Sequence, residues 1–111
     1  MVVKEADIQS QIIEFLKAAG VLHWRMPVDG VRTGQGRRRS PIKGFPDIAG
    51  VHKGTFFGIE VKRLKGRFYP EQLVWAEKLQ SHGAWYLTAT SLNDVVEFIQ
   101  KLKSGTAWRQ Q

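Results

Sequence analysis

The chain contains no cysteine, which excludes disulfide bonds and thiolate metal sites. It also contains no apolar run close to the ~20 residues that a membrane-spanning helix needs. Residues 1–7 lack the basic and then apolar order of a signal peptide. Together these absences favour a cytoplasmic protein without a membrane partner.

Acidic residues are scarce relative to basic ones. The 111 residues include 17 Lys and Arg but only 10 Asp and Glu, which gives a formal net charge of +7. Such an excess favours a polyanionic partner such as nucleic acid, which binds through phosphate contacts and counterion release. A surface charged only for solubility is the alternative. The length indicates one domain over residues 1–111, with no repeat or linker to divide it.

Hydrophobic spacing predicts three helices and four strands. The helical pattern covers residues 6–19, 70–81 and 92–103. Strand-like runs cover residues 21–26, 47–51, 56–61 and 84–89. The resulting order of α, β, β, β, α, β, α predicts an α/β (α+β) fold in which helices cover a small mixed sheet.

Two basic segments are candidates for phosphate contacts. One of them covers residues 62–67. Residues 104–111 belong to neither segment and are predicted to be a loose tail. The other basic segment, residues 29–44, is rich in glycine and arginine and is predicted to be a long mobile loop. A solvated loop without a ligand is the alternative. The candidate nucleic-acid-binding residues in the two segments are Arg37, Arg38, Arg39 and Lys43, followed by Arg63, Lys65 and Arg67.

Two carboxylates and a lysine are predicted to share one face of a hairpin. Lys53-Gly54 is a turn signal, and a two-residue loop without a bulge places Asp47 opposite Glu60, with Cβ atoms roughly 5 Å apart. Lys62, two residues further on, lies on the same face. Because like charges this close need compensation, a divalent cation with oxygen ligands is the simplest partner. In a basic protein, this combination points to phosphodiester hydrolysis.

Two further residues join this set. In the first predicted helix, Glu5 edges the apolar side and is a candidate third metal ligand, whereas Glu14 lies about 180° away and should face solvent. A helix N-terminal acid favoured by the macrodipole is the other interpretation of Glu5. Gln72, which follows Pro70, can contact a phosphate or position Lys62; an ordinary polar surface residue is its alternative.

The order of these motifs resembles a known family. Gly44-Phe45-Pro46-Asp47, Ile59-Glu60-Val61-Lys62-Arg63, Gly66 and Gln72 resemble the VRR-NUC branch of the PD-(D/E)XK nuclease superfamily, as does the opening Glu5-Ala6-Asp7-Ile8-Gln9. The likeness covers about residues 5–99. It departs at Tyr69, where a Ser or Thr helix cap would be more usual.

The resemblance implies a restriction-endonuclease-like αβββαβ core with a four-stranded mixed sheet. It implies hydrolysis of DNA with Mg²⁺ or Mn²⁺ as the cofactor. Glu5, Asp47 and Glu60 would bind the metal. Lys62 would position or activate the attacking water, and Gln72 would support Lys62.

The resemblance also implies a stand-alone, phage-type endonuclease that acts as a homodimer on four-way junctions or other branched DNA. Trp85, Tyr86 and the last helix are candidate interface elements. A non-catalytic DNA-binding module on the same fold is the main alternative. A small basic interaction protein with no nucleic-acid role is a weaker third.

Overall fold

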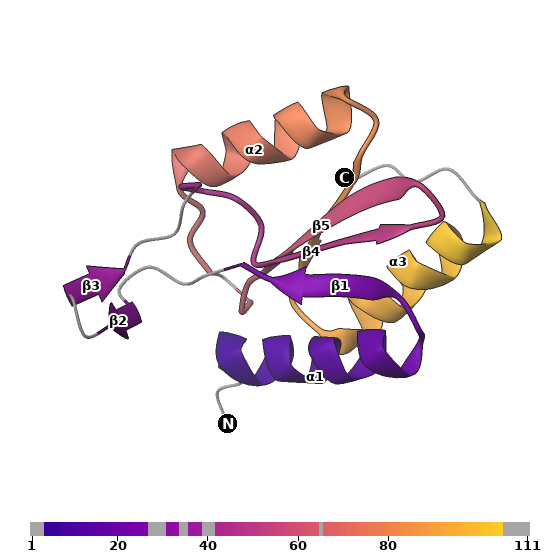
Figure 1. Ribbon diagram of the computed structural model, residues 1–111, viewed down its shortest axis with the longest axis horizontal. Helices are drawn as coiled ribbons and strands as arrows, with labels where there is room; N and C mark the ends of the chain where they lie inside the picture. The colour runs from indigo at the N-terminus through magenta and orange to yellow at the C-terminus, as the bar shows by residue number, and fades with distance from the viewer. Residues whose placement is uncertain (1–3, 27–30, 34–35, 39–41, 65, 106–111) are drawn as a thin grey trace.

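A four-stranded mixed sheet with helices on both faces forms the body of the protein (Figure 1). The computed structural model describes residues 4–26, 31–33, 36–38, 42–64 and 66–105. The elements in chain order are α1 (Glu5–Ala18), β1 (Leu22–Arg25), β2 (Val31–Thr33), β3 (Gly36–Arg38), β4 (Ile48–His52), β5 (Thr55–Val61), α2 (Pro70–Ser81), β6 (Trp85–Ala89) and α3 (Leu92–Ser104).

The strands of the large sheet follow the order β1-β4-β5-β6. Strands β1, β4 and β5 pair antiparallel, whereas β6 pairs parallel to β5 after the crossover through α2. This arrangement confirms the predicted α/β class and the mixed four-stranded sheet. In the described part of the chain, no helix has the length and apolar character needed to cross a membrane.

The hairpin of β4 and β5 has the predicted register. Lys53 and Gly54 both have positive φ (47° and 86°), as a two-residue hairpin turn of type I′ requires. Ile48 therefore pairs with Ile59. Because β4 begins at Ile48, Asp47 directly precedes the strand and lies at the open end of the hairpin.

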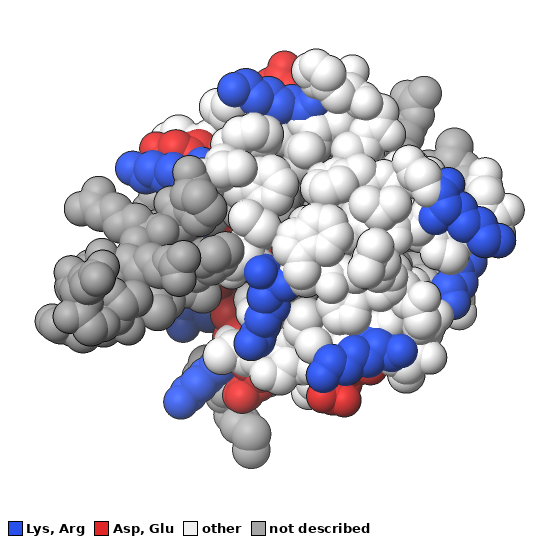
Figure 2. Space-filling model, in the orientation of Figure 1, with Lys and Arg blue, Asp and Glu red and all other residues white. Residues whose placement is uncertain are grey.

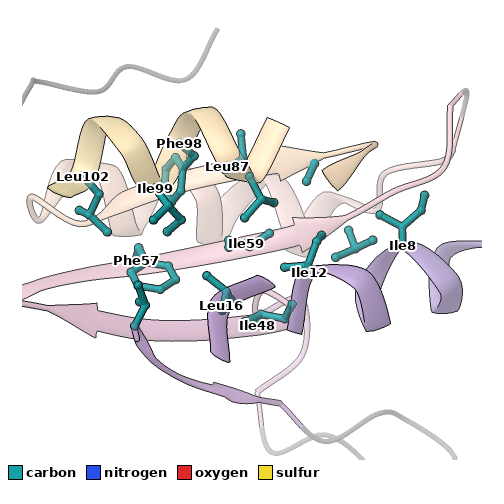
Figure 3. Close-up of a cluster of buried hydrophobic side chains, with 14 residues drawn as sticks. Ile8, Ile12, Leu16, Ile48, Phe57, Ile59, Leu87, Phe98, Ile99 and Leu102 are labelled. Carbon is teal, nitrogen blue, oxygen red and sulfur yellow. The ribbon is translucent and has the colours of Figure 1, made fainter. Parts of the chain in front are cut away.

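The main core lies between one face of the sheet and the helices α1 and α3. Figure 3 shows apolar side chains of both helices converging on β4, β5 and β6. The rings of Phe57 and Phe98 meet edge to face, with centroids 6.0 Å apart. The helical spacing of apolar residues in α1 and α3 places these residues on the buried side: Ile8, Ile12, Leu16, Val95, Phe98, Ile99 and Leu102.

Helix α2 covers the opposite face of the sheet, across from α1 in Figure 1. Pro46 is fully buried on this face. A Cβ atom on Gly58 would lie 2.7 Å from Pro46 Cγ and 3.5 Å from Leu79 Cδ1. The glycine therefore lets the turn before β4 sit directly on β5. The rings of Phe45 and Trp75 then join this turn to α2, at a centroid distance of 5.2 Å.

The prediction of an unstructured loop over residues 29–44 is wrong in part. Strands β2 and β3 lie within it and pair antiparallel, with Arg32 opposite Arg37. Each strand has three residues, too few to show an apolar alternation in the sequence. The tail is predicted to begin at residue 104, but Ser104 is the last residue of α3. Residues 106–111 of the predicted tail lie outside the described residues.

Tyr86 is not available as an interface residue. Its side chain is 3% exposed, within the sheet face that α2 covers. Trp85 is half-buried and packs edge to face on Phe98, with a centroid distance of 5.7 Å. Both aromatics therefore contribute to the fold of one chain, and the interface predicted around them is wrong for Tyr86.

Replacing Gly44 by alanine should destabilise the fold more than the same change at Gly20. Both glycines have positive φ (83° and 71°), which costs about 1–2 kcal/mol for alanine. Only at Gly44 would the new Cβ collide with another segment, 2.5 Å from the Glu71 backbone. This overlap should add about 1–3 kcal/mol, measurable by urea denaturation. Equal losses for Gly44→Ala and Gly20→Ala would show that the close approach to α2 carries no stability.

Candidate active site

The predicted chemical residues meet at the open end of the β4–β5 hairpin. Asp47 precedes β4, whereas Glu60 and Lys62 stand at the end of β5. The first turns of α1 and α2 bring Glu5 and Gln72 to the same place. Four segments that are far apart in the sequence therefore build one polar site at the edge of an apolar core.

Asp47 is fixed by strands on both sides. Its backbone carbonyl accepts a hydrogen bond from the Met26 N–H at 2.9 Å, just beyond β1. Its Oδ2 accepts one from the Val61 N–H at 2.9 Å, just beyond the end of the β4 ladder. Burial raises the pKa of Asp47 above its ordinary value, although the hydrogen bond from Val61 opposes this shift.

Glu60 is the most buried charged residue of the described chain, at 2% exposure. Its Oε2 accepts a hydrogen bond from Gln72 Nε2 at 2.8 Å and lies 3.7 Å from Lys62 Nζ. Its Oε1 is buried and has no hydrogen-bond partner among the described residues. Burial first, and then the negative charge of Asp47, raise the pKa of Glu60 to about 8.

Lys62 is held between an acid and two aromatic rings. Its side chain is buried, and Nζ lies 5.3 Å from the ring centroid of Phe68 and 5.8 Å from that of Tyr69. The Lys62 N–H donates to the Ala89 carbonyl at 2.9 Å, which anchors the backbone to β6. The sequence analysis does not predict that Phe68 and Tyr69 contact Lys62. The feature that could have indicated it is the pair of adjacent aromatic residues in an otherwise basic segment.

Gln72 joins the start of α2 to Glu60. Its Oε1 accepts a hydrogen bond from the Tyr69 N–H at 2.9 Å, while its amide nitrogen donates to Glu60. The oxygen thus satisfies one of the free N–H groups at the helix start, where a Ser or Thr cap is missing. In this structure the Gln72 amide positions Glu60, whereas the sequence predicts Lys62 or a phosphate as its partner.

Glu5 lies beside the carboxylate pair without joining it. Its Oε2 accepts a hydrogen bond from the Arg63 N–H at 3.4 Å, and its charge raises the pKa values of Asp47 and Glu60. Glu14 is exposed, as the helix phase predicts. Within the described residues, no group of three His, Cys, Asp or Glu side chains is arranged to hold a metal ion.

Asp47 and Glu60 have the chemistry that a divalent cation requires. Glu60 is buried and Asp47 half-buried, the pKa of each carboxyl is raised, and Glu60 Oε1 has no hydrogen-bond partner among the described residues. A hard cation takes oxygen ligands and would offset the repulsion between the two acids. The pair therefore fits a cation, whereas Glu5 contributes charge from nearby.

A basic pocket of about 340 Å³ opens beside Lys62. It carries four cationic side chains and one acid; its lining residues are Lys4, Glu5, Lys62, Arg63, Arg67 and Tyr69. On the face shown in Figure 2, basic side chains lie at several places, some of them beside acidic side chains. The pocket places four basic side chains around one concave volume.

The structure locates only part of the predicted nucleic-acid-binding set. Arg63 and Arg67 line the pocket. Lys43 is exposed, with its Nζ 3.9 Å from Glu71 Oε2. Arg39 and Lys65 lie outside the described residues, and only the backbone is described for the two arginines of β3, Arg37 and Arg38.

Comparison with known proteins identifies no family for this chain. No protein-family model matches it. A search of the curated proteins gives no significant match either. The function proposed below therefore depends on the residues of the site and on their geometry.

Without metal, the unfolding free energy of the protein should fall as pH rises from about 4.5 to about 8. Glu60 has an ordinary pKa of 4.5 and a folded-state pKa of about 8, so the folded chain binds the extra proton in this window. Glu60→Gln should flatten the dependence, because its amide does not titrate and its carbonyl can still accept from Gln72. Urea denaturation across this pH range measures the effect.

The exposed acid Glu14 supplies the matched control for this experiment. Glu14→Gln should keep the wild-type dependence on pH, since no burial acts on that side chain. Identical slopes for wild type and Glu60→Gln would contradict the raised pKa of Glu60.

Proposed function

We propose that this protein is a metal-dependent DNA endonuclease that hydrolyses phosphodiester bonds. The observation that carries the proposal is the pair of half-buried Asp47 and buried Glu60, with Lys62 Nζ 3.7 Å from Glu60 Oε2. Perturbed carboxylates beside a basic pocket are typical of sites that act on a charged substrate. Withdrawing these two carboxylates from water is costly, and chemistry at the site gives a reason to retain them.

The motif order supports the choice of nuclease. The resemblance to the VRR-NUC branch rests on residues that lie together in space, although they are up to 67 positions apart in the sequence, from Glu5 to Gln72. The elements α1, β1, β4, β5, α2 and β6 occur in the αβββαβ order that the resemblance implies. The small hairpin of β2 and β3 is an insertion between the first two of these strands.

Asp47 and Glu60 would hold Mg²⁺ or Mn²⁺ through their oxygens. When bound, such a cation supplies Lewis-acid stabilisation of the charge that develops on the phosphate. The chain's own part is to orient the ligands: the Val61 N–H fixes Asp47, and the Gln72 amide fixes Glu60. Because the folded-state pKa of Glu60 is about 8, this side chain must release its proton before it can serve as a ligand.

Lys62 would stabilise negative charge on the reacting phosphate. Its stem is buried and its Nζ is restrained by Glu60 on one side and by Phe68 and Tyr69 on the other. An ammonium oriented in advance loses little free energy to reorganisation as charge develops. It also lines the basic pocket, so it can reach a phosphate bound there.

The substrate that we propose is branched DNA, cut by a homodimer. A domain of this size contacts only a short stretch of duplex, and a C₂ pair would present two equivalent sites to a symmetric junction. The choice of DNA and of branched substrates is supported by the family resemblance.

A non-catalytic DNA-binding module is the second candidate. It is favoured by one observation, the lack of a third metal ligand beside Asp47 and Glu60 in the described residues. Such a module would bind DNA in EDTA and would cut it under no metal condition. The cleavage and metal-binding experiments below separate the two candidates.

Asp47→Asn should abolish cleavage of a labelled four-way junction in Mg²⁺ or Mn²⁺, because a neutral amide cannot replace the carboxylate. Lys62→Met should lower the cleavage rate by about 10²–10³-fold, the usual effect of losing one charge-stabilising donor. Both variants should still bind the junction in EDTA, as gel shift would show.

The exposed residues Asp7 and Lys17 allow matched controls on α1. Asp7→Asn and Lys17→Met should cut at the wild-type rate, because neither side chain lies at the site. Cleavage by a pure Asp47→Asn preparation would refute the assignment of the site.

Mn²⁺ should raise the thermal unfolding midpoint of the wild type but not that of Glu60→Gln. A ligand that binds only the folded state stabilises it by RT ln(1 + [L]/Kd), about 2.7 kcal/mol at a concentration of 100 Kd. Differential scanning calorimetry at a series of Mn²⁺ concentrations measures the shift without any cleavage assay. An equal shift in both proteins would place the cation elsewhere.

A further inference from the structure

The basic pocket is sized for a single small group. Its volume of about 340 Å³ is at the lower end of the range of about 300–1,000 Å³ for small-ligand sites. A DNA duplex, whose major groove alone is about 12 Å wide, is far too large to enter such a space. A nucleic acid can therefore place only one nucleotide, or a part of one, in the pocket.

The charges around the pocket suit a phosphate. Lys4, Arg63 and Arg67 contribute three exposed cationic side chains, and Lys62 a fourth that is buried. Glu5 is the one acid among the described lining residues, and its Oε2 accepts from the Arg63 N–H. Basic side chains placed in this way hold the backbone of a nucleic acid whatever its sequence.

Tyr69 gives the pocket an aromatic wall. Its side chain is 57% exposed, although its ring is a large apolar surface. The neighbouring Phe68 and Leu64 are also exposed, at 39% and 78%. The segment between β5 and α2 thus combines cations with exposed rings, which is the composition of surfaces that bind single-stranded nucleic acid by stacking.

Only an unpaired nucleotide can use such a wall. In a duplex, each base lies between its stacked neighbours, so its face is closed to a side chain. A base outside the stack has a free face and can lie on Tyr69 while its phosphates meet Arg63 and Arg67. On the basis of the proposed nuclease function, we infer that this pocket binds one unpaired nucleotide at a branch in DNA, stacked on Tyr69.

Fluorescence anisotropy in EDTA tests this site without cleavage. The probes are a labelled duplex with a single-stranded flap and a blunt duplex with the same base pairs, at one fixed salt concentration. The wild type should bind the flapped duplex more tightly. Tyr69→Leu should weaken flap binding by about five- to a hundredfold and weaken blunt-duplex binding far less, so that the preference for the flap is lost. Tyr69→Phe should retain the preference, because the ring remains.

Val74 provides the matched control, because it is an exposed apolar residue of α2 (48%) that does not line the pocket. Val74→Ala should keep the preference for the flap. A 2-aminopurine base in the flap should lose fluorescence when the wild type binds, because stacking quenches it, and this readout needs no variant to fold. Equal affinity of the wild type for both probes, or an unchanged preference in Tyr69→Leu, would overturn the inference.

The same preparations separate this site from the proposed hydrolysis. A preference for the flap without cleavage in Mg²⁺ or Mn²⁺ would refute the nuclease and support the pocket. Cleavage without that preference would refute the pocket alone.

Discussion

The site depends on the burial of the Glu60 carboxylate next to Asp47. Glu60 stands on β5, a central strand, with only 2% of its surface exposed. Removing a carboxylate from water is costly unless it is neutralised or paired. Gln72 and Lys62 offset part of this cost, but burial and the charge of Asp47 still raise the pKa of Glu60 to about 8. A chain selected for stability alone would place an apolar residue there.

The rest of the fold keeps this unfavourable group in place. One face of the sheet carries a continuous apolar core with α1 and α3, which stabilises the strands irrespective of the site. The other face leaves space at Gly58 for the buried Pro46, so that Asp47 reaches the end of β5. Gly44 permits the same turn to approach the backbone of α2 closely. The face that α1 and α3 cover thus supplies the main apolar core, while the face that α2 covers positions the carboxylates of the candidate site.

Much of this arrangement could be predicted because its causes are local. Apolar spacing located α1, α3 and the four strands of the large sheet, while Pro70 and His82-Gly83 gave α2 its observed bounds. The Lys53-Gly54 turn fixed the hairpin register, since a two-residue loop permits one pairing of its flanking residues. The same register placed the acids side by side, and the helix phase correctly turned Glu14 toward solvent.

The remaining features arise from contacts between segments that no local pattern encodes. The hydrogen bond from Gln72 to Glu60 depends on how α2 crosses the sheet. The contacts of Lys62 with the rings of Phe68 and Tyr69 depend on how the chain turns after β5. Tyr86 is likewise buried because α2 packs over that face of the sheet, which no local pattern indicates. The sequence by itself determined the elements, the register and the identity of the chemical groups, because backbone geometry and periodicity act over a few residues. Tertiary structure alone decided which groups lose water and which partners they meet, because solvation and charge interactions depend on distance in space.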